Sequence, residues 1–296
     1  MSEKQQLRIG LPKGSLQNST MELFRKAGFP ATVDDRAYAP DLGDDELWGV
    51  LLRAQELPEY IAHGVLDCGL TGYDWILERD VEVVEVCDLL YAKGGMRPYN
   101  WVLAVHESSG IEGWQGLQGK RIATELVDVT RRFLAENGVE AEVEFSWGAT
   151  EAKCPDLVDA VVEGTETGST LRANNLQIIE TLFTSCTKFV ANKEAWEDPW
   201  KRAKIESIAL LLNAALEAEN KVGLKMNARE EDLSAVIACL PALKKPTISP
   251  LANGGDDHWV AVETIVDAKI VKDLIPALKA AGAQGIIEYP LSKVVI

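Results

Sequence analysis

The residues best suited to chemistry stand in one short stretch, EGTETGSTLR, at positions 163–172. Gly168 can adopt backbone angles that turn successive N–H groups toward one point. N–H groups and hydroxyls together bind a phosphate, and a carboxylate beside them can hold a ribose hydroxyl or Mg²⁺. The stretch therefore predicts a sugar-phosphate site, although an ordinary turn that caps a helix explains the loop alone equally well. The acidic and hydroxyl side chains around the glycine are Glu163, Glu166, Thr167, Ser169 and Thr170.

The segments on either side of this stretch must position it. A helix is expected over residues 171–182, with its N-terminus aimed at the bound phosphate. Residues 156–162 are expected to form a short helix or a strand before the loop. On a helix, Asp159 and Glu163 would share one face because they are four residues apart.

Charge decides which classes of partner are reasonable. The chain has 296 residues, 47% of them hydrophobic, and carries a formal charge of −16 from 30 basic and 46 acidic side chains. Such a length suits one large domain or two smaller ones with sizeable cores. A nucleic-acid partner is not expected, because nucleic-acid-binding proteins present basic surfaces. An acidic protein that binds phosphates must concentrate its few cations, use backbone N–H groups or recruit a metal.

Cysteine usage and the first residues predict the compartment. The five cysteines are not in CxxC spacing and the three histidines are scattered, so neither a disulfide framework nor a zinc site is expected. The start, MSEKQQ, leads straight into an apolar strand-like run, and no apolar run is long enough to span a membrane. We therefore expect a cytoplasmic protein with no signal peptide and no membrane partner.

Strand-like and helix-like segments alternate through the first two thirds of the chain, which is typical of parallel α/β layers. Residues 187–191 read as a strand that leads back to the first part of the chain. A second unit is expected to start near Trp101, so the chain crosses between the units twice. Two crossings predict an α/β core of two lobes with a cleft between them, as in periplasmic binding proteins. The expected first lobe comprises residues 1–100 and 187–219, and the second comprises residues 101–186.

The pattern changes after Asn220. The segments over residues 222–289 read, in order, as strand, helix, strand, strand, helix and strand. This βαββαβ order predicts a ferredoxin-like module, whose size is normal for a small separate domain. We expect the module to span residues 220–296.

Five short motifs, in order along the chain, resemble those of the ATP phosphoribosyltransferase family in its long form, the first enzyme of histidine biosynthesis. One such motif alone is a weak signal, whereas five in the right order are a strong one. The resemblance extends over nearly the whole chain. The motifs are LPKGSL (11–16), the block 53–74 with RAQELPEYI and GLTG, GKRIATE (119–125), the loop of residues 156–176, and PTISPL with WVAV in the C-terminal module.

The resemblance implies that N1 of the adenine ring of ATP attacks the anomeric carbon of phosphoribosyl diphosphate, and that diphosphate leaves. The nucleophile belongs to the substrate, so catalysis depends on alignment and charge placement. Mg²⁺ is expected on the diphosphate, since it binds mainly through substrate phosphates and few protein groups. L-Histidine is expected as a feedback inhibitor. The ACT-type C-terminal module is expected to help assemble a homo-oligomer, a dimer or a hexamer.

The same resemblance assigns roles to individual residues. The expected catalytic residues are Glu163, Lys13 and Arg53. Phosphoribosyl diphosphate is expected to bind to Glu163, Glu166, Thr167, Gly168, Ser169 and Thr170. ATP is expected near strand ends, where α/β sheets bind ligands, on Lys13, Gly14, Thr71, Gly72 and Asp74. Histidine is expected near Thr247 and Ser249.

Simpler interpretations of single residues stay open. Lys13 could be a solvated turn residue, and Arg53 could form a surface ion pair. Asp74 could cap the helix that follows it. Glu125, which also follows a strand, could have a purely structural role.

Two departures from the family pattern are visible. Gly164 and Thr165 stand where the family commonly has two apolar residues. A softer loop, with altered affinity for the diphosphate substrate, is expected from this change. Ser15 stands where a basic residue is usual, so one phosphate contact is expected to be missing.

Three other functions compete with this interpretation. A solute-binding protein has the same two-lobed layout, because fold does not determine function, but the absent signal peptide and the TGST loop argue against it. A phosphoribosyltransferase of the common Rossmann-like type would carry two adjacent acids before its loop, and this chain does not. An inactive regulatory partner would not need the complete loop and Lys13.

Overall fold

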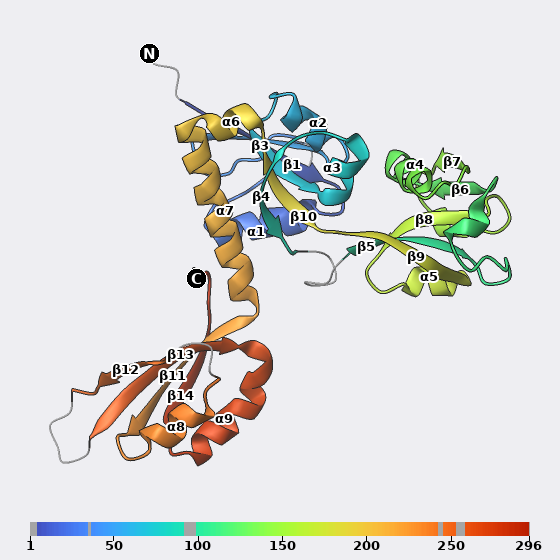
Figure 1. Ribbon diagram of the computed structural model, residues 1–296. Coiled ribbons are helices and arrows are strands. Elements are labelled where there is room, and N and C mark those ends of the chain that lie inside the picture. Colours follow the sequence, from blue (N-terminus) through green and yellow to red (C-terminus); the bar gives the residue numbers. More distant parts are fainter. Residues whose placement is uncertain (1–4, 35–36, 92–98, 242–244, 253–257, 296) are drawn as a thin grey trace. The chain divides into compact units, whose positions relative to one another are not determined.

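The computed structural model describes residues 5–34, 37–91, 99–241, 245–252 and 258–295. These residues belong to two compact units (Figure 1). The first unit is made of the described residues of Met1–Arg25 and Phe29–Ala209, and the second of those of Lys26–Gly28 and Leu210–Ile296. None of the helices in the described ranges combines the length and the apolar character that a membrane span requires.

The first lobe of the first unit is a five-stranded sheet in the order β2-β1-β3-β10-β4. β1 pairs in parallel with β2 and β3, and β10 runs antiparallel between β3 and β4. Leu7, Ile9 and Leu11 of β1 are fully buried, as expected of a central parallel strand with both faces covered. The elements of this lobe are β1 (Leu7–Lys13), α1 (Gln17–Ala27), β2 (Leu47–Arg53), α2 (Leu57–Ala62), β3 (Cys68–Gly72), α3 (Tyr73–Arg79), β4 (Val84–Leu89), β10 (Thr187–Ala191) and α6 (Lys193–Glu197).

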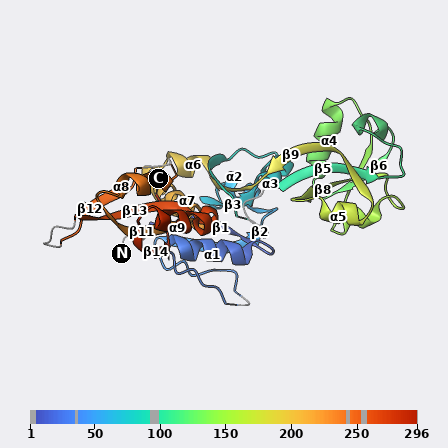
Figure 2. The same ribbon diagram turned by 90° about the horizontal axis from the view of Figure 1, so that it is seen from below.

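The second lobe is a five-stranded sheet in the order β7-β6-β8-β5-β9. Helices α4 and α5 lie on opposite faces of this sheet (Figures 1 and 2). The side chains of β5 alternate accordingly: Leu103 and Val105 pack in the core under α4, whereas Val102 packs with Leu171 of α5. The elements are β5 (Tyr99–His106), η1 (Trp114–Leu117), β6 (Arg121–Thr124), α4 (Val127–Glu136), β7 (Glu142–Phe145), η2 (Thr150–Lys153), β8 (Ala160–Thr165), α5 (Ser169–Ala173) and β9 (Leu176–Ser185).

The two sheets share one plan. Each has three parallel strands, then an antiparallel strand, then an edge strand. The chain passes from the first lobe to the second between β4 and β5, and it returns between β9 and β10. This topology confirms the predicted two-lobed α/β core of the periplasmic-binding-protein type.

The two lobes are in contact through α3 and α4. The carboxylate of Glu78, on α3, accepts hydrogen bonds from the backbone N–H groups of Asp128 (3.0 Å) and Val129 (3.0 Å) in the first turn of α4. A carboxylate is favoured there, because the first N–H groups of a helix have no intrahelical partner.

Two sequence-based expectations around the glycine-rich stretch are wrong. The helix expected over residues 171–182 is only the five-residue α5, and strand β9 begins at Leu176. Between them the chain turns at Asn175, whose φ is 55°. Asp159 and Glu163 do not share a helix face, because Glu163 lies within strand β8.

The second unit contains a four-stranded antiparallel sheet in the order β12-β13-β11-β14. This is the ferredoxin-like arrangement that the βαββαβ pattern predicts. The core between the sheet and helices α8 and α9 includes Leu224, Val262 and Leu278. The longer segment of this unit begins at Leu210, within α7 (Pro199–Glu219), and a domain boundary at residue 220 stays a prediction. Its other elements are β11 (Lys221–Arg229), α8 (Leu233–Cys239), β12 (Thr247–Pro250), β13 (Trp259–Asp267), η3 (Ala268–Ile270), α9 (Val271–Ala280) and β14 (Gln284–Pro290).

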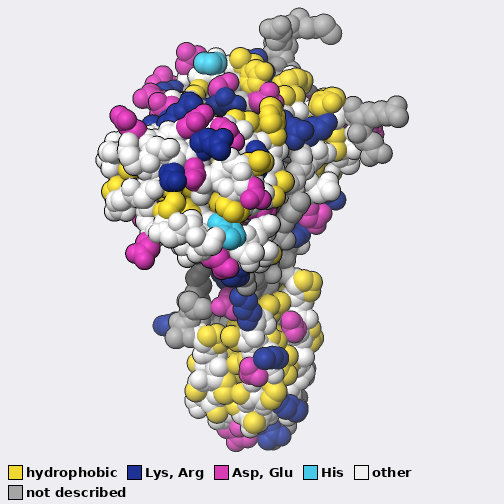
Figure 3. Space-filling view, turned by 90° about the vertical axis from the view of Figure 1, so that its right-hand side faces the viewer, with side chains coloured by type: hydrophobic (Ala, Val, Ile, Leu, Met, Phe, Trp, Pro, Cys, Tyr) yellow, Lys and Arg dark blue, Asp and Glu magenta, His cyan; other side chains and the backbone are white. Residues whose placement is uncertain are grey.

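The charged side chains of the described surface are mixed in sign. On the face shown in Figure 3, Lys and Arg side chains are interspersed with Asp and Glu side chains. Acidic residues outnumber basic ones by 46 to 30 in the chain, so a bound polyanion needs local groups rather than a broad basic field.

Candidate active site

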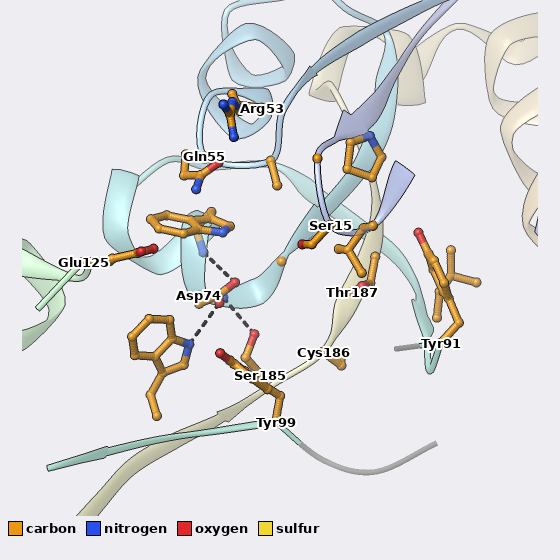
Figure 4. A pocket seen from close by; sticks show the side chains of 18 of the residues that line it. Ser15, Arg53, Gln55, Asp74, Tyr91, Tyr99, Glu125, Ser185, Cys186 and Thr187 are labelled. Carbon is orange, nitrogen blue, oxygen red and sulfur yellow. Dashed lines mark hydrogen bonds between the residues drawn. The ribbon is translucent and has the colours of Figure 1, made fainter. Parts of the chain in front are cut away.

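A cavity of about 440 Å³ in the first unit brings together side chains from both lobes (Figure 4). Seven of the predicted site residues line it: Lys13, Gly14, Arg53, Gly72, Asp74, Glu163 and Glu166. Glu125, for which a structural role was the open alternative, lines it as well. The motifs that contain these residues lie far apart in the sequence, so their convergence on one cavity supports a common site.

The carboxyl ends of parallel strands explain this convergence. Lys13 and Arg53 are the last residues of β1 and β2 and lie side by side in the parallel register. In the second lobe, Glu125 follows β6 directly and Glu163 lies near the end of its parallel neighbour β8. Side chains at this edge of a parallel sheet meet in the crevice where α/β proteins bind ligands.

Two cations of the cavity are available to a ligand. The Nζ atom of Lys13 lies 3.6 Å from the centroid of the Tyr38 ring, which is a cation–π contact. The Arg53 guanidinium lies beside Gly14, whose Cβ position would be 3.7 Å from Nη1. Among the described residues neither cation forms an ion pair. The surface ion pair that was the alternative for Arg53 is therefore not seen in this part of the chain.

Asp74 is buried and already has protein partners. Its Oδ2 accepts a hydrogen bond from the indole N–H of Trp101 (2.9 Å), and its Oδ1 accepts one from the backbone N–H of Trp75 (3.0 Å). The Asp74 N–H donates to the hydroxyl of Ser185 (3.1 Å). Burial is the main cause that raises the pKa of Asp74. Because Trp101 and Ser185 belong to the second lobe, Asp74 joins the two lobes at the cavity wall, and a direct contact with ATP stays a prediction.

The Glu163 carboxyl is partly buried in the part of the cavity wall that the second lobe provides. Its pKa is raised to about 7, mainly by burial; a hydrogen bond with Thr150 lowers the pKa, and the charges of Glu151 and Glu125 add to the rise. Burial, and then the charge of Asp74, also raise the pKa of Glu125. A carboxyl that changes its charge near neutral pH can accept hydrogen bonds from sugar hydroxyls or exchange a proton with a ligand.

The glycine-rich loop is held closed by its own residues. Gly168 has a φ of 68°, in the left-handed region, and its N–H donates to the hydroxyl of Thr165 (2.8 Å). The hydroxyl of Thr167 donates to that of Ser169 (3.1 Å). Gly164 and Thr165 belong to β8, and the Thr165 hydroxyl ties the turn, whereas the expected effect of these two residues on substrate affinity stays a prediction. N–H groups of the first turn of α5 remain as donors, since a helix leaves them without intrahelical partners.

Five of the residues predicted to bind the two substrates do not line the cavity. The side chain of Thr71 is fully buried and donates to the carbonyl oxygen of Ala54 (2.9 Å). Residues 167–170 of the loop are also absent from the lining, and Gly168 borders a separate hollow together with Arg172. The structure brings the acids of the loop, Glu163 and Glu166, to the cavity, but it does not bring the hydroxyls there.

The sequence reasoning missed the aromatic part of the wall. Trp75, Tyr91, Tyr99 and Trp101 line the cavity, and the rings of Tyr99 and Trp101 meet edge to face with centroids 6.1 Å apart. A signal was present, because Tyr99 and Trp101 are two residues apart at the start of a strand and so point to one face. Aromatic side chains offer a flat apolar surface to a purine base.

The donor set of the cavity is compatible with a metal ion that binds mainly through the substrate. Among the described residues no group of three or more His, Cys, Asp or Glu side chains is arranged to hold a metal. The cavity carboxylates Glu125, Glu163 and Glu166 provide oxygen atoms. Mg²⁺ commonly uses one or two such carboxylates together with substrate phosphates, so a protein cage is not needed.

The residues predicted for histidine lie in the second unit. Thr247 and Ser249 are exposed on the edge strand β12, with Glu263 and Ala261 of β13 as their cross-strand partners. Cross-strand partners share a face, so the four side chains lie on one face of the sheet.

Comparisons with known proteins identify the family. The family model described as "ATP phosphoribosyltransferase" matches residues 53–214, and the model described as "HisG, C-terminal domain" matches residues 218–293. The ATP phosphoribosyltransferase of Chlorobaculum parvum is 58% identical over 98% of this chain and 97% of its own length. That of Prosthecochloris aestuarii is 56% identical over 99% of each chain.

A solved structure also supports the family assignment. The structure entitled "ATP phosphoribosyl transferase (HisG:HisZ) complex from Thermotoga maritima" matches with a TM-score of 0.62 and 28% identity, over 72% of this chain and 100% of that chain. The match of residues 218–293 to the C-terminal model confirms the predicted long form. Over nearly its whole length, this chain belongs to the ATP phosphoribosyltransferase family.

Proposed function

We propose that this chain transfers the phosphoribosyl group of phosphoribosyl diphosphate to N1 of ATP and releases diphosphate, as the first step of histidine biosynthesis. The observation that supports the proposal most is the cavity lined by Lys13, Arg53 and Glu163, in which neither cation has an ion-pair partner among the described residues. Such a cavity suits a substrate that is anionic at its leaving group and carries sugar hydroxyls beside it.

Charge placement can do most of the catalysis. As the bond to diphosphate breaks, negative charge grows on the leaving group and positive charge grows on the sugar. Lys13 and Arg53 would stabilise the first, and the carboxylate of Glu163 would hold the ribose hydroxyls and stabilise the second. The wall of Trp75 and Trp101 would orient the adenine base and exclude water that could attack the sugar. No protein nucleophile is needed, because N1 of ATP attacks.

Mg²⁺ would bind the diphosphate and neutralise part of its charge. Glu125 and Glu166 are the cavity carboxylates whose oxygen atoms could hold the ion or its water shell. The 5′-phosphate would be bound by N–H groups and hydroxyls of Thr167, Ser169 and Thr170. Because these residues do not line the cavity as described, this assignment requires the loop to turn its donors toward the ligand.

Regulation and assembly complete the proposal. L-Histidine would inhibit by binding near Thr247 and Ser249, which are exposed on β12. The chain would act as a homo-oligomer in the cytoplasm.

A single set of rate measurements tests this function. Purified protein is mixed with ATP, phosphoribosyl diphosphate and Mg²⁺, and near-ultraviolet absorbance reports the N1-substituted adenine. Product is expected only when both substrates are present, and added L-histidine is expected to lower the rate. Binding of an amino acid without any turnover would contradict the proposal and would favour a solute-binding function.

A further inference from the structure

The ring of Tyr99 occupies the space where a side chain at position 164 would stand. A Cβ atom added to Gly164 would lie 2.3 Å from the ring Cε1 and 2.3 Å from the phenol oxygen. Contacts this short do not occur, so any other residue at this position would have to displace the ring. The φ angle of Gly164 is not in the left-handed region, and glycine is therefore required here by the approach of Tyr99 and not by the backbone.

The second unit also has a tyrosine ring packed over a strand glycine, but the hydroxyl of that tyrosine is bonded within the protein. A Cβ atom added to Gly223 of β11 would lie 2.3 Å from the ring of Tyr289. The hydroxyl of Tyr289 donates a hydrogen bond to Oε1 of Glu263, at an oxygen–oxygen distance of 2.6 Å. An aromatic ring over a strand glycine is a known way to stabilise a sheet, and Tyr289 shows that device with its polar end satisfied.

Tyr99 differs from Tyr289 in that its hydroxyl is available to a ligand in the cavity. Among the described residues it has no hydrogen-bond partner, yet it belongs to the cavity lining (Figure 4). Burial first, and then the charges of four cavity carboxylates, raise the pKa of this phenol. The hydroxyl therefore stays protonated at working pH and remains a donor. The four carboxylates are Glu163, Asp74, Glu125 and Glu166.

We propose that the Tyr99 hydroxyl donates a hydrogen bond to an oxygen of the ribosyl substrate, and that Gly164 makes room for it. Neutral donors have particular value in a cavity lined by acids, because carboxylates would repel a polyanion and cannot donate to its oxygens. Tyr99 lies against the residue that follows Glu163, the acid assigned to the ribose hydroxyls, so the sugar is the part of the ligand within reach. This inference deepens the proposed function and rests on it.

Steady-state kinetics of Tyr99→Phe test the contact. The variant keeps the ring over Gly164 and removes only the hydroxyl. At saturating ATP, kcat/KM for phosphoribosyl diphosphate is expected to fall about three- to tenfold, the effect of one neutral hydrogen bond. At saturating phosphoribosyl diphosphate, the KM for ATP is expected to change less than twofold. An unchanged kcat/KM for phosphoribosyl diphosphate would overturn the inference, as would an equal effect on both substrates.

A double-mutant cycle tests the role of Gly164. Gly164→Ala is expected to lower kcat/KM at least as much as Tyr99→Phe does, because the added methyl group displaces the whole ring. In the Tyr99→Ala background, the same substitution is expected to change kcat/KM less than twofold, because the ring it displaces is gone. Additive effects of the two substitutions would show that Gly164 does not act through Tyr99.

The second unit provides matched controls. Tyr289→Phe and Gly223→Ala disturb the same packing device but not the cavity lining, so they are expected to lower the thermal midpoint and leave kcat/KM unchanged when histidine is absent. Thermal midpoints of all variants show whether a kinetic loss reflects unfolding. If wild-type protein forms no product, the proposed function fails; if wild type turns over and Tyr99→Phe matches it, only this inference fails.

Discussion

Replacement of Glu163 by Gln is expected to make the protein more stable at alkaline pH and less active at the same time. The carboxyl is partly buried in the cavity wall, and its pKa is about 7 mainly because of burial. Gln has nearly the same shape, stays neutral and can still bond with Thr150. The substitution therefore removes the charge of this position while keeping its volume.

The size of the stability effect follows from the pKa. Folding raises the pKa of Glu163 from 4.5 to about 7, so the folded protein binds this proton more tightly than the unfolded chain does. The free energy of unfolding of the wild type therefore falls as the pH rises through this interval. A rise of this size corresponds to at most about 3 kcal/mol, and solvent screening at a partly exposed group reduces the cost to about 1–2 kcal/mol.

Thermal unfolding at pH 4.5 and at pH 8, together with kinetics at pH 8, measures both effects. At pH 4.5 the variant and the wild type are expected to be equally stable. At pH 8 the variant is expected to be more stable by about 1–2 kcal/mol, or roughly 2–4 °C for each kcal/mol in a unit of this size. Loss of a charged hydrogen-bond acceptor for the ribose is expected to lower kcat/KM about ten- to hundredfold.

A matched carboxyl on the surface is the control. Glu142 is exposed on β7, and Glu142→Gln is expected to change stability by less than about 0.5 kcal/mol and to leave the rate unchanged. If Glu163→Gln were as active as the wild type, the role assigned to this acid would be wrong. If its stability at pH 8 did not exceed that of the wild type, the burial argument would be wrong.

Three further substitutions test other parts of the site. Arg53→Ala is expected to lower kcat/KM for phosphoribosyl diphosphate about tenfold or more, with partial recovery in Arg53→Lys, and equal rates for all three proteins would refute the contact with the diphosphate. Thr165→Val removes the acceptor for the Gly168 N–H and is expected to cost about 1 kcal/mol in urea unfolding and to raise the KM for phosphoribosyl diphosphate, whereas an unchanged KM would show that closure of the turn is unimportant. Trp101→Phe leaves one oxygen of the buried Asp74 without its donor and is expected to cost about 1–3 kcal/mol by the same method; a loss below 0.5 kcal/mol would contradict the proposed connection between the lobes.

The sequence predicted the layered architecture well, for a physical reason. Apolar runs such as that of β1 bury both faces, and the order of strands and helices then restricts the topology. The run after Asn175 forms strand β9 where a phosphate-binding helix is expected. Its β-branched Ile178, Ile179 and Thr181, preceded by two asparagines, favour a turn and a strand.

The site was predictable only in part. Lys13 and Arg53 could be placed together because each ends a strand, and parallel strands of one sheet end at one edge. Glu163 lies in the sheet of the second lobe and was predictable only from its loop motif. The pair of Asp74 and Trp101 could not be read in the same way, since it joins residues 27 positions apart in different lobes. The dependence of Gly164 on Tyr99 is likewise a matter of packing, which a one-dimensional pattern does not contain.

A crystal structure of the protein in complex with phosphoribosyl diphosphate and Mg²⁺ would show directly where the substrate binds. We expect the diphosphate beside Lys13 and Arg53, the ribose hydroxyls on Glu163, and the 5′-phosphate on the N–H groups of the first turn of α5. Density for the ligand elsewhere, with this cavity holding only water, would contradict this expectation.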